Sequence, residues 1–131
     1  MTENVGLPKA AWNDKTKAFV AEYHKRYNAD PSGAVMESYD AAWLIFDAIK
    51  TSNGTEPKAI INALENTKYV GARGQYSFST SHEPAWHYHQ FLEAPLSILQ
   101  YADVKQGQAD APIVWPRQYA TVPYTYKKPG T

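Results

Sequence analysis

The sequence predicts an α/β protein in which a helix, a strand and two helices are followed by short antiparallel strands. Before residue 70, apolar residues recur at the spacing of amphipathic helices. After residue 70, proline and glycine break the chain into short segments with strand periodicity. The 131 residues supply apolar material for one hydrophobic core, so we expect a single domain or fragment of a domain.

The balance of charges and the absence of cysteine exclude several classes of function. The chain has 13 Lys and Arg residues against 13 Asp and Glu residues, so it offers no electrostatic footprint for nucleic acid. It has no cysteine, which excludes disulfide scaffolds, thiol nucleophiles and thiolate metal sites. The longest apolar run, residues 41–46, is far shorter than the roughly 20 residues of a membrane span. We therefore expect no direct membrane insertion, and the first residues do not resemble a signal peptide.

The first predicted helix spans residues 15–27 and follows a cap at Asn13 or Asp14. Asn28 and Pro31 end it. One side of this helix carries apolar and aromatic residues, namely Phe19, Val20, Tyr23 and Tyr27. The remaining positions are largely charged, which predicts a helix that packs along one stripe.

The apolar run 33–36 lies between turn signals and predicts a buried strand. Ser38 then caps a second helix over residues 39–51, with Asp40 in the first turn where the helix dipole favours a carboxylate. This helix is apolar on nearly all sides, so we expect other elements to cover it and Trp43 to lie in the core.

Asn53 and Gly54 end the second helix, and Thr55 caps a third helix that has Pro57 in its first turn. Gly71 then opens the region of strand periodicity. We expect strands at 75–78, 86–92, 96–104 and 113–115, with Trp115 packed at the end of the last one. Residues 117–131 are expected to form an extended tail.

Six blocks carry a resemblance to a known family: 17–31, 38–49, 59–64, 71–78, 98–101 and 113–116. The second block begins Ser38-Tyr39-Asp40-Ala41-Ala42, and the fourth places Gly71 and Gly74 before Phe78. In this order and spacing, over roughly residues 12–116, the blocks resemble the C-terminal third of a type I periplasmic solute-binding protein. The group most similar to them is the branched-chain amino-acid type of ABC-transporter receptor.

The resemblance implies a periplasmic, bilobed receptor that closes on a small solute and delivers it to an ABC permease. The solute would be an amino acid or another small carboxylate, and neither a cofactor nor enzymatic activity is implied. Residues 12–70 would end the first lobe, and residues 71–116 would return to the second. The N-terminal two-thirds of the family has no counterpart in this sequence. We therefore expect an incomplete type I fold that binds solute weakly alone.

The candidate ligand-binding residues are Met36, Glu37 and Ser38, at the junction of the predicted strand and the second helix. Ligands of open α/β sheets bind outside the carboxyl ends of strands, and a helix start offers unpaired N–H groups to an anion. The resemblance places this junction on the first-lobe side of the cleft, where Glu37 would meet an ammonium group. The alternative is that Ser38 only caps the helix and Glu37 is solvated.

Two further hypotheses remain. On a strand, His87 and His89 would share one face and could reach a metal ion with His82 or Glu83, with Glu83 serving as the base of a zinc hydrolase. We favour a polar surface strand and predict no metal site. The other hypothesis is a self-associating fragment, in which a second copy covers the apolar second helix and pairs the lone parallel strand. This predicts a homo-oligomer, formed by exchange of the C-terminal strands. The tryptophans could also stack on sugars, but core packing is favoured.

Overall fold

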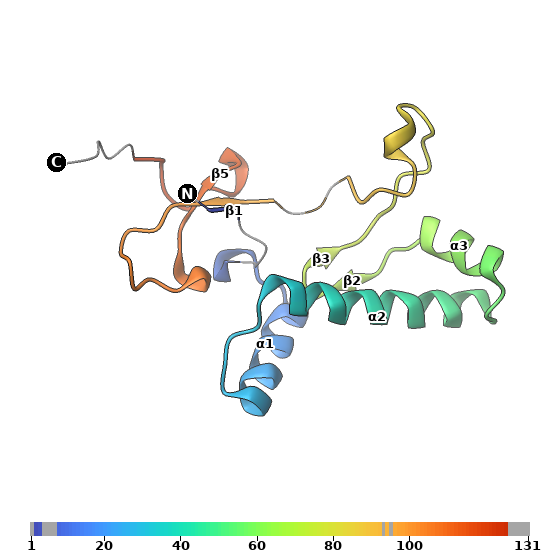
Figure 1. Cartoon of the computed structure of the whole chain (residues 1–131), viewed down its shortest axis with the longest axis horizontal. Helices are drawn as coiled ribbons and strands as arrows, with labels where there is room; N and C mark the ends of the chain where they lie inside the picture. The colour runs from blue at the N-terminus through green and yellow to red at the C-terminus, as the bar shows by residue number, and fades with distance from the viewer. Residues whose placement is uncertain (1, 4–7, 93, 95, 126–131) are drawn as a thin grey trace. The chain divides into compact units, whose positions relative to one another are not determined.

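The computed structural model describes residues 2–3, 8–92, 94 and 96–125, and the chain forms two compact units (Figure 1). One unit consists of Asn13–Pro95 and contains three helices and a short hairpin. The other unit joins Met1–Trp12 to Leu96–Thr131 and contains a small sheet. None of the helices in the described ranges has the length and hydropathy of a membrane span.

Helix α1, Asp14–Tyr27, begins where the sequence predicts because Asn13 caps it. The side chain of Asn13 accepts a hydrogen bond from the Thr16 N–H at 2.8 Å, and the Thr16 hydroxyl accepts one from the Asn13 N–H at 3.1 Å. This reciprocal pair satisfies two of the backbone donors that a helix start leaves unpaired. The helix ends at Asn28, which adopts a left-handed conformation with φ 49°.

Helix α2, Gly33–Ser52, begins earlier than predicted, so the expected strand over residues 33–36 is wrong. Ser32 caps the helix by accepting a hydrogen bond from the Val35 N–H, and residues 33–36 form the first turn. The Ser38 hydroxyl, expected to be the cap, donates to the Ala34 carbonyl at 2.9 Å inside the helix. A run of four apolar residues fits either a strand or a helix, and here the cap at Ser32 favours the helix.

One stripe of α2 is buried within the described structure, and the rest of the helix is half-buried or exposed. The buried residues are Gly33, Met36, Asp40, Leu44 and Ala48, and the last four recur every four residues. Tyr39, Trp43, Ile45 and Phe46 are exposed. The expectations that other elements cover the helix and that Trp43 lies in the core are therefore wrong. The physical reason is that, among the described residues, no element covers the side of the helix that carries Trp43, Ile45 and Phe46.

Helix α3, Pro57–Glu65, follows the left-handed residue Asn53 and packs beside α2 (Figure 1). Pro57 occupies its first position, as the sequence predicts, but the capping position is Glu56 rather than Thr55. Pro57 suits this place because the first helical N–H has no partner within the helix. The helix is short, and its packing against α2 rather than its own propensity stabilises it.

Strands β2, Val70–Gly71, and β3, Gly74–Gln75, form an antiparallel hairpin in which Gly71 faces Gly74. Gly74 has φ +122°, a conformation that side-chain-bearing residues rarely adopt. The strand was expected over residues 75–78. The observed strand β3 starts one residue earlier, at Gly74, and ends at Gln75. The expected strand over 86–92 is wrong, because Ala85–His87 forms a 3₁₀ turn and His89 is left-handed.

The hairpin turn, residues 71–74, is held by a buried carboxylate. Asp40 is fully buried and accepts hydrogen bonds from the Ala72 N–H at 2.7 Å and the Arg73 N–H at 2.8 Å. The Tyr76 hydroxyl donates a third hydrogen bond to this carboxylate at 3.0 Å. Buried carboxylates persist where such donors compensate for the loss of water. Asp40 therefore fixes the turn to the first half of α2.

The start of α1 binds the carbonyl groups of the same turn. Asn13 donates from its side-chain amide to the Gly71 carbonyl at 3.0 Å, and the Thr16 hydroxyl donates to the Ala72 carbonyl. Asp40 accepts from the N–H groups of the turn, whereas Asn13 and Thr16 donate to its carbonyls. We use the name hairpin clamp for Gly71 of the turn together with the four residues that hold the turn, namely Asn13, Thr16, Asp40 and Tyr76.

The second unit contains a three-stranded antiparallel sheet in the order β1-β4-β5. Its strands are Thr2–Glu3, Ile98–Leu99 and Ile113–Trp115. Leu99, Ala111 and Ile113 form its buried cluster. Both sheets of the described residues are antiparallel, so the predicted lone parallel strand is absent from them.

The last strand, 113–115, is confirmed, whereas the strand expected over 96–104 is confined to β4. Trp115 does not pack as expected, because it is the last residue of its strand and its side chain is exposed. In the expected tail, Arg117–Tyr119 forms a 3₁₀ turn, and residues 126–131 lie outside the described residues.

Replacement of Gly71 by alanine is expected to destabilise the protein, because the added Cβ would collide with the Asp40 carboxylate. Overpacking of this kind costs about 1–3 kcal/mol. Gly54→Ala is the matched control, because nothing lies within 4 Å of the position that its Cβ would occupy. Urea unfolding should show the loss for Gly71→Ala and a change within about 0.5 kcal/mol for Gly54→Ala. Equal stabilities for the two variants would contradict the clamp.

Candidate functional site

The predicted ligand-binding residues lie in the first two turns of α2 and not at the end of a strand. Met36 is buried, whereas Glu37 and Ser38 are exposed. The N–H groups without a helical partner belong to residues before Met36, whose own N–H donates to the Ser32 carbonyl. The argument from a strand end and a helix start therefore does not apply to these three residues. Of the three, Glu37 alone brings a charge to the surface.

Glu37 forms an ion pair with Arg73 of the hairpin turn. The Glu37 side chain is 46% exposed, whereas that of Arg73 is only 11% exposed. Burial lowers the pKa of Arg73, against an opposing effect of Tyr76. Its Nε atom is buried and has no hydrogen-bond partner in the described part of the chain. The pair therefore presents one accessible carboxylate beside a largely buried guanidinium.

The sequence alone did not identify Arg73 as a site residue. It lies in a glycine-containing turn far along the chain from Glu37, and no local pattern links the two. The hairpin clamp brings them together, because the Arg73 N–H is one of the two that Asp40 binds. A long-range contact of this kind follows from the tertiary structure rather than from residue spacing.

Two phenols have raised pKa values: Tyr76 of the hairpin clamp, which is buried, and Tyr69, which is half-buried. Burial raises the pKa of Tyr76, and the negative charge of Asp40 and its hydrogen bond to the phenol raise it further. Burial likewise raises the pKa of Tyr69 to about 12, with further contributions from the charges of Asp40, Tyr39 and Asp47. Both phenols are therefore protonated at neutral pH, and Tyr76 acts as a donor to Asp40.

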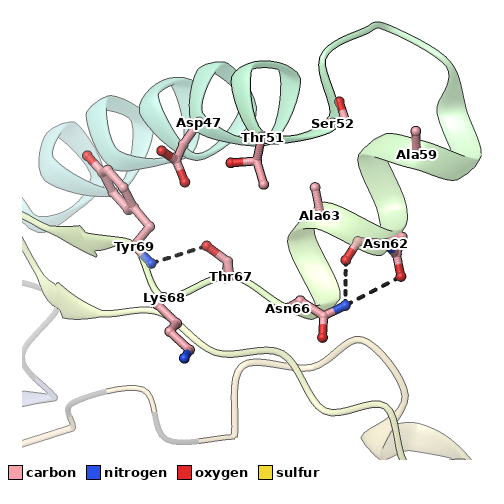
Figure 2. A pocket seen from close by; sticks show the side chains of 10 residues that line it. All are labelled: Asp47, Thr51, Ser52, Ala59, Asn62, Ala63, Asn66, Thr67, Lys68 and Tyr69. Atoms are coloured by element: carbon pink, nitrogen blue, oxygen red, sulfur yellow. Dashed lines mark hydrogen bonds between the residues drawn. The ribbon is translucent and has the colours of Figure 1, made fainter.

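A groove of about 650 Å³ lies between α2, α3 and the segment that leads into β2 (Figure 2). We call it the α2–α3 groove. Its volume falls in the range of small-molecule sites. The lining residues are Asp47, Thr51, Ser52, Ala59, Asn62, Ala63, Asn66, Thr67, Lys68 and Tyr69. No feature of the sequence pattern marked these positions, because they come from three separate segments.

Several polar groups of this groove are already paired. The Asn66 amide donates to the Asn62 carbonyl at 2.8 Å, and the Tyr69 N–H donates to the Thr67 hydroxyl at 3.2 Å. Asp47, in contrast, is unpaired within the described residues. Its carboxylate is half-buried and has neither a hydrogen bond nor an ion pair within the residues that the structure describes.

The histidine-rich segment forms a stack of rings rather than a strand face. Tyr88 stacks on His82, with ring centroids 3.9 Å apart, and on His89, with centroids 3.7 Å apart. His89 contacts Glu65 of α3 at 2.8 Å, whereas His87 packs against Trp86. The expected common face of His87 and His89 is therefore wrong.

Within the described ranges, no group of three or more His, Asp or Glu side chains is placed to hold a metal ion. Glu83, the proposed base, is exposed in the loop that precedes the 3₁₀ turn. The segment instead ties the loop to the end of α3 through His89 and Glu65.

Comparisons with known proteins agree with the blocks found in the sequence. The sequence matches the periplasmic binding protein family over residues 4–102. Among solved structures, the chain is similar to the leucine-binding protein LivK from Thermotoga maritima, with 27% sequence identity and a TM-score of 0.53. The match covers 59% of this chain and 22% of the LivK chain, so it spans about a fifth of that protein's length. No curated protein matches the chain.

The family match extends over most of the chain, and the structural match shows that the elements are arranged as in part of a type I periplasmic binding protein. The predicted fold class is therefore confirmed, although the strand that was expected before the second helix is helical. The chain belongs to the periplasmic binding protein family.

Proposed function

We propose that this chain forms part of the solute receptor of an ABC importer, which captures a small solute in the periplasm and passes it to a permease. The observation that carries the proposal is the family match over residues 4–102. The similarity to a protein described as leucine-binding favours an amino acid or a related small carboxylate as the solute. The receptor would act by binding and release, without covalent chemistry.

The solute contact that we propose lies in the first turns of α2, at Met36, Glu37 and Ser38. Glu37 is the exposed carboxylate that would accept hydrogen bonds from an ammonium group. The Arg73 guanidinium, whose side chain is 11% exposed, would bind the carboxylate of the same solute. A zwitterion would thus meet both members of the ion pair. Met36 is buried and would support this part of the helix.

We expect the chain alone to bind such a solute weakly. Tight small-molecule sites bury most of the ligand surface, and receptors of two lobes achieve this by closing about a hinge. The chain aligns with 22% of the LivK structure, so the contacts proposed here lie on one side of a solute. Partial contact leaves the solute and the Glu37 carboxylate largely hydrated, which limits the affinity.

Substitution Glu37→Gln is expected to weaken the contact with the solute ammonium. In NMR titrations of the whole chain, leucine should shift the amide signals of Glu37 and Arg73 with an affinity in the millimolar range, about 4 kcal/mol of binding free energy. The variant should lose these shifts. Glu22→Gln is the matched control, because Glu22 is an exposed carboxylate of α1 that pairs with Arg26.

The outcomes of this titration separate the possibilities. Binding of 4-methylpentanoate, which lacks the ammonium group, with the affinity of leucine would contradict the role of Glu37. Leucine shifts confined to residues away from Glu37 and Arg73 would overturn the proposed contact. Submicromolar binding to this chain would contradict the requirement for a second lobe.

A specific feature also favours self-association. Six aromatic rings form a continuous ladder from α1 to α2, with neighbouring centroids between 4.6 and 6.2 Å apart. In order they are Tyr27, Tyr23, Phe19, Tyr39, Trp43 and Phe46. Four of them are well exposed, at 63% for Tyr27, 42% for Tyr39, 47% for Trp43 and 59% for Phe46. We propose that this aromatic ladder packs against the ladder of a second copy. Exposed apolar patches favour association, and with a net charge of zero two copies do not repel each other.

Sedimentation velocity tests the aromatic ladder. We expect a dimer or a higher oligomer at micromolar concentrations, and a folded monomer for the double variant Trp43→Ser, Phe46→Ser. Trp86→Ser serves as the control, because Trp86 is 67% exposed and contacts His87 rather than the ladder. A folded monomer of the unchanged chain at every concentration would show that the ladder does not mediate self-association.

A further inference from the structure

The α2–α3 groove is a second candidate binding site, distinct from the solute contact at Glu37. Asp47 lies ten residues after Glu37 on the same helix, which places the two about 15 Å apart along its axis. Figure 2 shows Asp47 and Thr51 pointing from α2 toward the segment that carries Thr67 and Tyr69. The groove therefore has its own set of converging polar groups.

The groove carries a negative charge that the described residues leave uncompensated. Asp47 is half-buried and unpaired within them, and its charge is one of the causes that raise the pKa of Tyr69. Lys68 also lines the groove, but Figure 2 shows its side chain pointing away from α2. The ammonium of Lys15 lies over the Tyr69 ring, 4.4 Å from its centroid, and this contact does not neutralise Asp47.

The remaining lining residues limit the chemistry of a ligand. Thr51, one helical turn after Asp47, offers a hydroxyl oxygen that can accept a further hydrogen bond. Ala59 and Ala63 of α3 supply a small apolar wall. A divalent metal ion needs several oxygen ligands, and Asp47 is the one carboxylate that lines the groove. An anion would be repelled by Asp47.

We propose that the α2–α3 groove binds a small primary alkylammonium ion. The ammonium group donates hydrogen bonds to the Asp47 carboxylate and the Thr51 hydroxyl, and its short alkyl chain lies against Ala59 and Ala63. A half-buried carboxylate makes a stronger charge-assisted bond than a fully hydrated one, because less water competes for it. Tyr69 leads directly into β2, so an occupied groove contacts the segment that enters the hairpin clamp.

Butylammonium is the probe, titrated into the whole chain while the amide signals of Thr51, Asn62 and Ala63 are followed by NMR. We expect saturable shifts at these residues, and a loss of affinity of at least tenfold for Asp47→Asn, about 1.4 kcal/mol. Asp14→Asn is the matched control, because Asp14 is an exposed aspartate of α1 that pairs with Lys17. Circular dichroism of each variant establishes that it is folded.

Butanol, which has the same chain without the charge, should leave these signals unchanged. The proposal is overturned if butylammonium does not saturate these shifts, if butanol produces the same shifts, or if Asp47→Asn binds as well as the unchanged chain. The leucine titration follows the amide signals of Glu37 and Arg73, which the butylammonium titration does not use. A negative result at one site therefore leaves the proposal for the other site intact.

Discussion

The carboxylate of Asp40 is the group on which the rest of the helical unit depends. It is fully buried in α2 and accepts hydrogen bonds from two backbone N–H groups and from Tyr76. Hydrogen bonds to charged groups contribute about 1.5–3 kcal/mol each, whereas a buried carboxylate without donors costs several kcal/mol. The hairpin turn and α2 therefore stabilise one another, and Gly71 is required because any side chain would occupy the place of this carboxylate.

Both proposed sites take their geometry from this clamp. Arg73 meets Glu37 because Asp40 binds the Arg73 backbone, which fixes the turn beside the first turns of α2. Tyr69 forms a wall of the α2–α3 groove because it immediately precedes β2, the strand that ends in the clamped turn. A rigid support of this kind holds charged side chains at fixed separations, which is what selective binding of a small solute requires.

Local signals in the sequence predicted part of this arrangement. Asn13 and Asn53 marked helix boundaries correctly, because caps act within one turn. The run 33–36 misled the prediction, because four apolar residues fit a strand or a helix equally well and the cap at Ser32 decided between them. The partners of Asp40 and Glu37 could not be predicted, since they lie in a hairpin whose position depends on tertiary contacts. The sequence did not mark Asp47 as a site residue either, because the groove that it lines also depends on tertiary contacts.

Native-state hydrogen exchange of the Ala72 and Arg73 amides tests most directly whether the buried carboxylate organises this unit. If Asp40 holds the turn, these two amides exchange as slowly as the central amides of α2, because they open only when the unit unfolds. Asp40→Asn should then accelerate both amides by at least tenfold. Exchange of Ala72 and Arg73 in the unchanged chain at the rate of an open loop would contradict the account.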